Sequence, residues 1–410
     1  MDRLEELKEK FNEYKHEKLS LNMQRGQPSN ANFDISNPML TCVKDGDFIT
    51  ESGVDIRNYP GGVIGLKEAR ELFSGILGVD PDEMVVGNNA SLKMLSNVLM
   101  WGLLRGLKNS KAPWSTTKNK IIVTVPGYDR HFRLLNDLGV EMISVDITSS
   151  GPDMDRVEEL VAGDDRIKGL LFVPIYSNPT GDSVSDETVK RLACMKTAAE
   201  DFTIFADNAY AVHHLYGDTK KPPDLLEACK NAGNPNRVYI FGSTSKITFA
   251  GAGIGFFGTS RENLEYITKL MGSEFIGPNK IEQYRHVKFI SGFEGGITGL
   301  MNTHAEILRP KFQAVDRILS RELGGSGLAE WTKPRGGYFI SLNTKKPVAR
   351  RVVELAKEAG VSLTPAGATY PFGKDPCNSN IRIAPTRPPL EDIKKAMKIL
   401  GICIKIASME

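Results

Sequence analysis

The chain has 410 residues, and its 52 lysines and arginines nearly balance its 50 aspartates and glutamates. A chain of this length exceeds one ordinary hydrophobic core, so we expect a large domain and a smaller one. The balanced charge provides no electrostatic basis for a nucleic-acid or anionic-membrane partner. The five cysteines are scattered and include no C-x-x-C pair, which argues against a zinc site and favours a reducing, cytoplasmic location.

The N-terminal residues 1–23 are rich in charge and predict an amphipathic helix that lacks the apolar centre of a signal peptide. A membrane-spanning helix needs about 18 consecutive apolar residues, and the sequence contains no such run. Secretion and membrane insertion are therefore not expected.

Short apolar runs alternate with helical patterns through most of the chain, which is typical of an α/β fold. Several runs are apolar at every position, as in parallel strands that are buried on both faces. Helices are expected between them at 91–107, 130–138 and 185–199, the last with Ser185 as its N-cap. The six strands expected in a central, mostly parallel sheet are 120–125, 141–147, 167–175, 202–206, 237–241 and 253–258.

The pattern changes after about residue 300. A long helix at 304–323 precedes a hairpin-like run at 333–342, a helix at 348–358, a short strand after Asn380 and a last helix from Leu390. We therefore predict a large domain at 49–300, a smaller α+β domain at 301–410, and an N-terminal segment, 1–48, that joins the smaller domain.

Lys246 is the first candidate for chemistry. It follows the strand-like run 238–242 in the sequence Ser243-Thr-Ser245-Lys246. A lysine at a buried strand end is costly unless its charge is paired or neutralised. Imine formation neutralises it and suits Schiff-base chemistry. For this tetrapeptide alone, a lysine that extends to the surface is the alternative.

Two more expected strands end in polar residues. Asp207 and Tyr210 follow the run 202–206, and Asn178 follows the run 167–175. Ligand sites of α/β sheets lie at this end of parallel strands. A pyridoxal ring needs an anion beside its pyridine nitrogen and hydrogen-bond donors for its phenolate oxygen. Asp207 fits the first requirement, and Asn178 and Tyr210 fit the second.

The motifs NPTG at 178–181, D-x-x-Y at 207–210 and S-x-S-K at 243–246 resemble, in this order, those of the fold type I enzymes that use pyridoxal 5′-phosphate (PLP), specifically class I/II aminotransferases. The resemblance extends from RGQPS at 25–29 to IRIAPTRPP at 381–389. It implies the corresponding α/β fold, PLP as cofactor, and transfer of an amino group from an amino acid to a 2-oxo acid. The resemblance also implies a homodimer.

The same resemblance assigns the phosphate of PLP to the start of a helix. The backbone amides of Asn89, Ala90 and Ser91 precede or open the expected helix 91–107, where the helix dipole favours an anion. A simple N-cap is the alternative. The Ser243 hydroxyl is similar to one that contacts the phosphate in the family, and Ser245 is placed with it.

Other roles follow only from the resemblance. Tyr128 matches the aromatic residue that stacks on the PLP ring, and His131 matches the residue that fixes the pyridine-pairing aspartate. Tyr59 resembles a tyrosine that reaches the phosphate of the neighbouring subunit, although YPGG is equally a turn with an aromatic anchor. Arg382 matches the arginine that binds the substrate α-carboxylate by bidentate contacts, with a surface arginine as the alternative. Gly26 and Asn178 are placed near the same carboxylate.

The chain departs from the family at residue 254, where an isoleucine stands in place of a phosphate-pairing arginine. This departure points to a divergent subgroup similar to bacterial aspartate aminotransferases. Two weaker patterns are present as well. The glycines of 253–258 match a dinucleotide fingerprint without its strand, turn and helix, and the pair His213-His214 has no further metal ligand beside it.

A dicarboxylic substrate needs a second cation. The candidates are Arg25, Arg130, Lys280 and Arg285, of which Lys280 and Arg285 share the segment NKIEQYRH and favour aspartate or glutamate as donor. A solvated helix face is the alternative for these charges. A lyase reaction on the same scaffold and a PLP-binding regulatory module without turnover are the competing functions.

Overall fold

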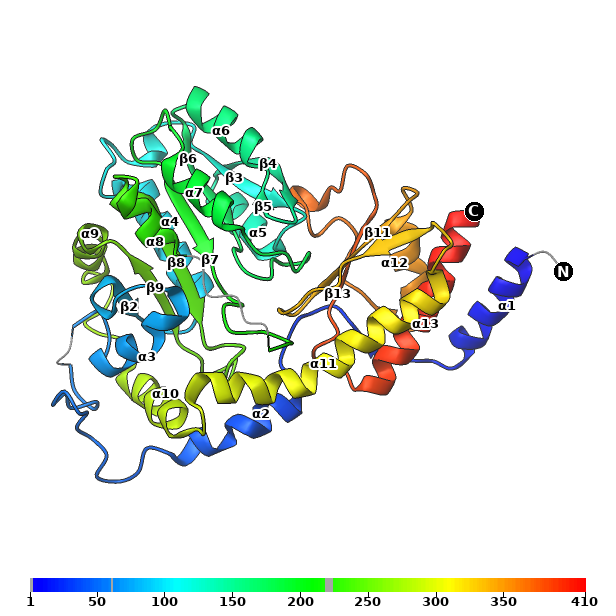
Figure 1. Cartoon of the computed structure of the whole chain (residues 1–410), viewed down its shortest axis with the longest axis horizontal. Helices are drawn as coiled ribbons and strands as arrows, with labels where there is room; N and C mark the ends of the chain where they lie inside the picture. The colour runs from blue at the N-terminus through cyan, green and yellow to red at the C-terminus, as the bar shows by residue number, and fades with distance from the viewer. Residues whose placement is uncertain (1–2, 60–61, 218–223) are drawn as a thin grey trace.

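The structure is a computed structural model that describes residues 3–59, 62–217 and 224–410. A large sheet occupies one side of the molecule and a three-stranded sheet the other (Figure 1). The large sheet has the order β2-β9-β8-β7-β6-β3-β4-β5, and β8, β7, β6, β3 and β4 are parallel. Its strands are β2 (Met84–Val86), β3 (Lys120–Val125), β4 (Glu141–Thr148), β5 (Gly151–Pro152), β6 (Ile167–Phe172), β7 (Thr203–Asp207), β8 (Val238–Ser243) and β9 (Gly255–Thr259).

All six expected strands are present, with ends that differ by a few residues from those expected. The sheet also contains β2 and β5, which are too short to produce a periodic pattern in the sequence. Strand β9 is antiparallel to both of its neighbours, β2 and β8. The prediction of a central, mostly parallel sheet is confirmed, and β9 lies within it as an antiparallel strand.

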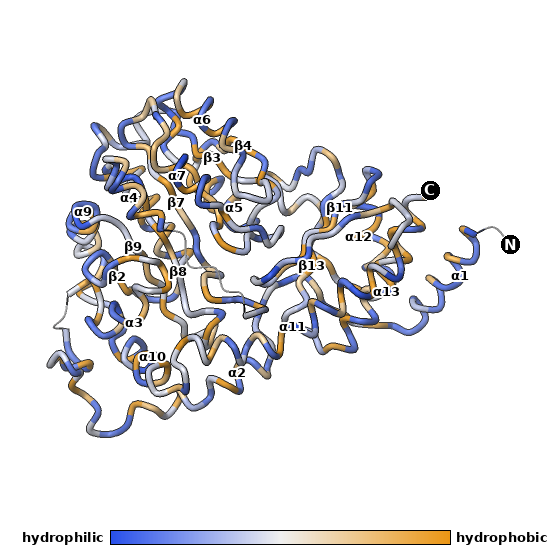
Figure 2. Tube along the Cα trace, in the orientation of Figure 1, coloured by the Kyte–Doolittle hydropathy of each residue, from blue (hydrophilic) through white to orange (hydrophobic). Residues whose placement is uncertain are grey.

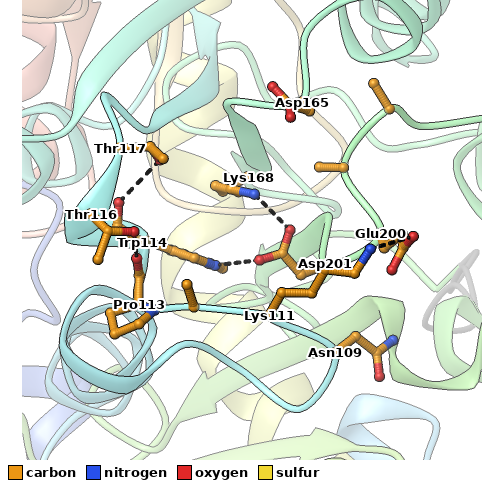
Figure 3. Close-up of a pocket in the computed structure, with 13 residues that line it drawn as sticks. Asn109, Lys111, Pro113, Trp114, Thr116, Thr117, Asp165, Lys168, Glu200 and Asp201 are labelled. Atoms are coloured by element: carbon orange, nitrogen blue, oxygen red, sulfur yellow. Dashed lines mark hydrogen bonds and ion pairs between the residues drawn. The ribbon is translucent and has the colours of Figure 1, made fainter.

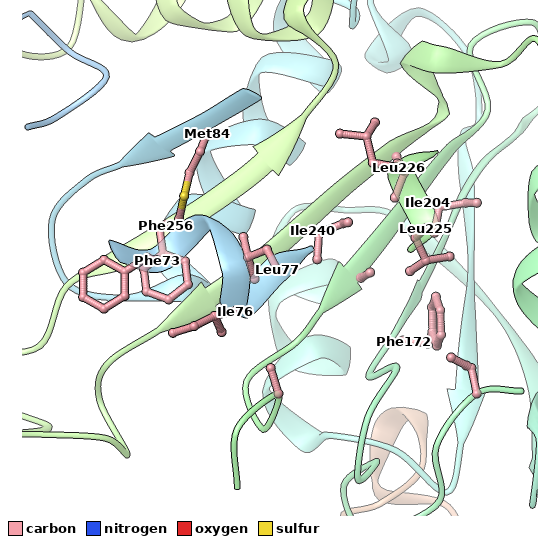
Figure 4. Packing of buried hydrophobic residues seen from close by; sticks show 14 of the residues in the cluster. Phe73, Ile76, Leu77, Met84, Phe172, Ile204, Leu225, Leu226, Ile240 and Phe256 are labelled. Atoms are coloured by element: carbon pink, nitrogen blue, oxygen red, sulfur yellow. The ribbon is translucent and has the colours of Figure 1, made fainter. Parts of the chain in front are cut away.

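The large sheet is buried on both faces because its strands alternate apolar side chains between two clusters. Ile121 and Val123 of β3 pack on one face, whereas Ile122 packs on the other. Figure 4 shows the second cluster, in which Phe73 stacks on Phe256 at 4.9 Å between ring centres. Hydrophobic colours accordingly mark much of the large sheet, to the left of the view in Figure 2. This two-sided burial explains the uninterrupted apolar runs of the sequence.

Helices cover both faces of the large sheet. The first face packs against α4 (Ser91–Arg105), α5 (Asp129–Asp137) and α9 (Arg261–Met271). The second face packs against α3 (Lys67–Leu77), α6 (Met154–Gly163), α7 (Asp186–Cys194), α8 (Leu225–Asn231) and α10 (Lys280–Gly292). The expected N-cap of α7 is present, since the Ser185 hydroxyl accepts a hydrogen bond from the Thr188 amide.

The three-stranded sheet is antiparallel, in the order β10-β11-β13. It shares an apolar core with α11, α12 and α13, and α1 packs on α13. A separate parallel pair joins β1 to β12. These elements are α1 (Arg3–His16), β1 (Leu21–Asn22), α11 (Gly296–Leu323), β10 (Ala329–Trp331), β11 (Ile340–Thr344), α12 (Ala349–Glu358), β12 (Val361–Ser362), β13 (Asn380–Ile383) and α13 (Leu390–Met409).

Two details differ from the expectations for the C-terminal region. The long helix α11 begins at Gly296, so residue 300 lies inside one continuous helix that extends along both sheets (Figure 1). The hairpin is formed by β10 and β11, and the run 333–342 contributes only its end to β11.

The remaining elements are α2 (Asn30–Ser36) and short 3-10 helices at Asn37–Thr41, Pro81–Glu83, Trp114–Thr116, Pro235–Arg237 and Pro371–Gly373. Within the described ranges, none of the helices combines the length and apolarity needed to cross a bilayer.

Candidate active site

A pocket of about 450 Å³ lies between the loops that follow the parallel strands and the three-stranded sheet. Tyr128, Tyr210 and Lys246 line it from the large sheet, and Phe339 and Arg382 line it from the smaller one. Carboxyl ends of parallel strands are the usual place for a ligand, and here they face a second wall. The other lining residues are Gln24, Arg25, Gly26, Gln27, Asp129, Arg130, Thr364 and Pro365.

A second cavity, of about 230 Å³, lies at the opposite, amino ends of the strands (Figure 3). Its central carboxylate, Asp201, accepts hydrogen bonds from Trp114 Nε1 at 2.8 Å and Lys168 Nζ at 2.9 Å, as well as one from Ser110 at 2.7 Å. Lys111 pairs with Glu200 at its rim. Because these charges neutralise one another, we assign this cavity a structural role.

Lys246 lies between β8 and β9, with its Nζ atom 5.0 Å from the centre of the Tyr210 ring. Burial lowers the pKa of Lys246, and the Asp207 carboxylate opposes that shift. The carbonyl oxygen of Lys246 accepts hydrogen bonds from Tyr338 Oη and His213 Nε2, each at 3.3 Å. His213 is neutral because burial lowers its pKa to about 3. Tyr338 and His213 therefore support the lysine, a role that sequence reasoning missed.

Asp207 ends β7 and is buried beside His131 of α5. His131 Nε2 lies 2.9 Å from Asp207 Oδ2, whereas Oδ1 has no hydrogen-bond partner among the described residues. The Tyr128 ring meets the His131 ring edge-on at 4.9 Å. Burial and the neighbouring carboxylates raise the pKa of Tyr128 to about 12, so its hydroxyl stays protonated. The expected pairing of His131 with Asp207 is present.

Arg382 on β13 projects toward the large sheet from a buried position. Its Nη1 atom lies 2.8 Å from Asp129 Oδ1 and 3.3 Å from Asn178 Oδ1, and its Nε atom donates to Thr364 Oγ1 at 3.3 Å. The guanidinium also lies over the Phe339 ring at 4.9 Å. Asp129, Thr364 and Phe339 were not identified from the sequence, because they contact Arg382 only through the tertiary fold.

Asn178 and Gly26 lie beside these groups. The Asn178 side-chain nitrogen is buried and makes no hydrogen bond within the described part of the chain. Gly26 approaches the Phe339 ring so closely that a Cβ atom there would lie 2.5 Å from Phe339 Cζ. A side chain at this position would therefore displace the Phe339 ring, which lines the pocket.

The groups of the expected phosphate cradle lie together at the start of α4. Ser243 Oγ lies 3.3 Å from Ser245 Oγ, which lies 3.4 Å from Asn89 Oδ1. The backbone of Ala90 packs against Gly255, where a Cβ atom would lie 2.6 Å from the Ala90 carbonyl carbon. Strand end, serine hydroxyls and helix N-terminus thus converge, as an anion site requires.

The structure also places the departures from the family pattern. Ile254 is buried among apolar residues, and its amide donates to Thr244 Oγ1 at 3.0 Å. Gly255 and Gly258 lie inside the antiparallel strand β9, so the dinucleotide interpretation is wrong. Across the described ranges, no group of three or more His, Cys, Asp or Glu side chains is arranged to hold a metal ion.

The four candidate cations for a distal carboxylate separate into two pairs. Arg25 and Arg130 are exposed, line the pocket and form no ion pair with the described residues. Lys280 is buried, and Arg285 pairs with Glu282 at 2.5 Å. Neither is among the residues that line the pocket, so within one chain the structure does not bring Lys280 and Arg285 to it.

Tyr59 lies outside the pocket, and its side chain is 68% exposed. The Tyr59 side chain therefore does not reach the pocket of its own chain, and it is exposed enough to contact another molecule.

Comparisons with known proteins agree with this geometry. The family model described as aspartate amino-transferase matches residues 1–410. An aspartate aminotransferase of Corynebacterium glutamicum is 44% identical over 407 residues, which cover 99% of this chain and 94% of the relative.

Solved structures extend the comparison. An aspartate transaminase from C. glutamicum superposes with a TM-score of 0.96 at 44% identity, covering 99% of this chain and 95% of the other. An α-aminoadipate aminotransferase from Thermus thermophilus, solved with N-(5′-phosphopyridoxyl)-L-leucine, shares the fold with a TM-score of 0.77 at 20% identity, covering 95% and 93% of the two chains. By the fold, the pocket and the match along its whole length, this chain belongs to the aspartate aminotransferase family.

Proposed function

We propose that this aminotransferase binds PLP through Lys246 and transfers the amino group of aspartate or glutamate to a 2-oxo acid such as 2-oxoglutarate. The observation that carries the proposal is a pair of buried polar atoms, Asp207 Oδ1 and the side-chain nitrogen of Asn178, beside the pocket that Lys246 lines; neither atom has a hydrogen-bond partner among the residues that the structure describes. Buried polar groups are rarely left unpaired unless a ligand completes them. A pyridine nitrogen and a phenolate oxygen are the groups that would do so.

The residues present fit the whole cofactor. Lys246 supplies the amine, the start of α4 with Ser243 and Ser245 suits a phosphate, and Tyr128 offers an aromatic face. When bound, PLP supplies an electron-accepting ring that stabilises negative charge at the substrate Cα. The T. thermophilus structure of the same fold, which contains a phosphopyridoxyl group, supports this assignment.

Three side chains of this protein have separate roles in the proposed reaction. His131 holds Asp207 in place, so that the carboxylate presents Oδ1 to the ring nitrogen. Arg382 binds the substrate α-carboxylate. When no substrate is bound, Arg382 pairs with Asp129 instead. Lys246, whose pKa is lowered by burial, would take the proton from the substrate Cα as general base and, as general acid, deliver it to the C4′ carbon of PLP.

Arg25 and Arg130 are proposed to receive the distal carboxylate of a dicarboxylic substrate. Both line the pocket and neither is paired with another described residue, so their charge is available. The name of the C. glutamicum relative supports aspartate as donor. Replacing each arginine by glutamine should raise KM for aspartate much more than KM for alanine, and equal effects on both donors would contradict the assignment.

We also propose that the enzyme acts as a homodimer in which Tyr59 contributes to the partner's site. Ile49, Tyr59 and Ile276 are exposed apolar side chains on this part of the molecule. Coexpressing Tyr59→Ala chains with Lys246→Ala chains tests the arrangement, because a mixed dimer regains one site with both residues. Activity above that of either variant supports it, and no gain refutes it.

The cysteines form no disulfide, which supports a cytoplasmic location.

One panel tests the reaction itself. The purified protein is incubated with PLP, 2-oxoglutarate and each amino acid in turn, and the glutamate formed is measured; for glutamate as donor, oxaloacetate replaces the acceptor and aspartate is measured. Dicarboxylic donors at the top support the proposal. Aromatic or aliphatic donors at the top overturn the substrate assignment, and pyruvate with ammonia in the absence of an acceptor would instead indicate a lyase.

A further inference from the structure

The inner face of α10 carries three buried polar side chains at a spacing of three residues. Lys280 is 5% exposed, and Gln283 and His286 are fully buried. Residues three apart on a helix share one face, so all three point into the molecule. Burying such groups is costly unless each is hydrogen-bonded. Each of them is, and each bonds to a different segment of the chain.

Lys280 and Gln283 hold two of these segments through backbone atoms. Lys280 Nζ donates to the carbonyl oxygens of Asn58 at 2.9 Å and Tyr59 at 3.1 Å. Gln283 Nε2 donates to the Val86 carbonyl at 2.9 Å, and Gln283 Oε1 accepts from the Leu66 amide at 2.8 Å. Val86 ends β2 shortly before the phosphate cradle. Helix α10 therefore restrains both the segment that contains Asn58 and Tyr59 and the residues that lead from Val86 to the start of α4.

His286 holds the segment that carries Lys246. Its Nδ1 atom lies 2.7 Å from the Glu282 carbonyl oxygen and so must donate a proton there. Its Nε2 atom lies 2.9 Å from Thr244 Oγ1 and 2.8 Å from Thr248 Oγ1, and it accepts from these hydroxyls. Burial lowers the pKa of His286 to about 4, which keeps this acceptor available at neutral pH. The two threonines lie two residues before and two residues after Lys246.

We propose that Lys280, Gln283 and His286 are positioning residues, which set the relative positions of the Lys246 segment, the phosphate cradle and the Tyr59 segment. This inference rests on the proposed PLP function and deepens it. It gives the NKIEQYRH segment a different role from the binding of a substrate carboxylate. His286 is the central member, because its two hydroxyl partners flank the lysine that reacts.

The test uses full-length His286→Leu and its conservative counterpart His286→Gln, whose side-chain oxygen can accept from the same hydroxyls. Arg285→Gln is the matched control on α10, at a partly exposed residue that pairs with Glu282, and His304→Gln is a second control at a buried histidine outside this network. For each protein, the dissociation constant of PLP, kcat and KM for aspartate, and the melting temperature are measured.

His286→Leu should weaken PLP binding and lower kcat, each by roughly tenfold, as supporting residues around a site commonly do. KM for aspartate should stay within about twofold, because Arg382 and the pocket arginines are untouched. His286→Gln should recover most of both losses, and Arg285→Gln should match the wild type.

Three results overturn the inference. One is a His286→Leu protein whose melting temperature falls while its PLP dissociation constant and kcat stay at the wild-type values. Another is failure of His286→Gln to recover either quantity, and the third is a large rise in KM for aspartate in Arg285→Gln. A wild-type protein that does not bind PLP would instead refute the proposed function, so the two failures are distinguishable.

Discussion

Replacing Arg382 by lysine tests the proposal that its planar guanidinium binds the substrate carboxylate. Lysine keeps the positive charge but offers one compact donor group instead of a fork. Arg382 is buried and already uses Nε and Nη1 toward Thr364, Asp129 and Asn178, which orients the guanidinium. A hydrogen bond to a charged group is worth about 1.5 to 3 kcal/mol. Losing one of two parallel contacts to the carboxylate should therefore cost about 2 kcal/mol.

At about 1.4 kcal/mol per factor of ten, this loss predicts a decrease of roughly 30-fold in kcat/KM for aspartate. The assay is steady-state transamination with PLP affinity measured in parallel, and PLP affinity should change little. Arg191→Lys is the matched control, because Arg191 is also held by carboxylates, those of Asp155 and Glu158, but outside the pocket. A decrease below about threefold in Arg382→Lys, or an equal decrease in Arg191→Lys, would refute the assignment of Arg382.

Three further outcomes are expected. Asp129→Asn removes the anion that pairs with Arg382 at 2.8 Å, and KM for aspartate should fall by up to about fivefold, since a partly exposed pair is worth at most about 1 kcal/mol; an increase would contradict this competition. Lys246→Ala should abolish both transamination and the covalent PLP adduct that borohydride reduction leaves, checked by peptide mass mapping; an adduct at another lysine would refute the lysine assignment. Burial lowers the pKa of His304 to about 4, so the folded form resists a proton that the unfolded chain accepts below about pH 6.5. Its share of stability, about 3 kcal/mol, should be lost as pH falls from about 6.5 to 4. The melting temperature of His304→Gln should accordingly depend less on pH in that range than that of the wild type, and an unchanged dependence would show that His304 is not the titrating group.

Much of the fold could be predicted from the sequence, because strands that are buried on both faces have continuous apolar runs. The same logic places Lys246, Asp207 and Asn178 at or after the carboxyl ends of strands, where ligands of such sheets usually bind. Sequence patterns do not predict strand β5 or the start of α11. The first is only two residues long, and the second begins at glycines that a sequence pattern treats as breaks.

The roles of charged side chains were decided only by the tertiary structure. Lys280 and Arg25 are equally cationic in the sequence, yet one is buried against backbone carbonyls and the other lines the pocket. Asp129 and Arg382 pair across 253 positions of the chain. Residue type determines what a group can bind, whereas the packing of distant segments determines which partner it meets, and no local pattern encodes that second choice.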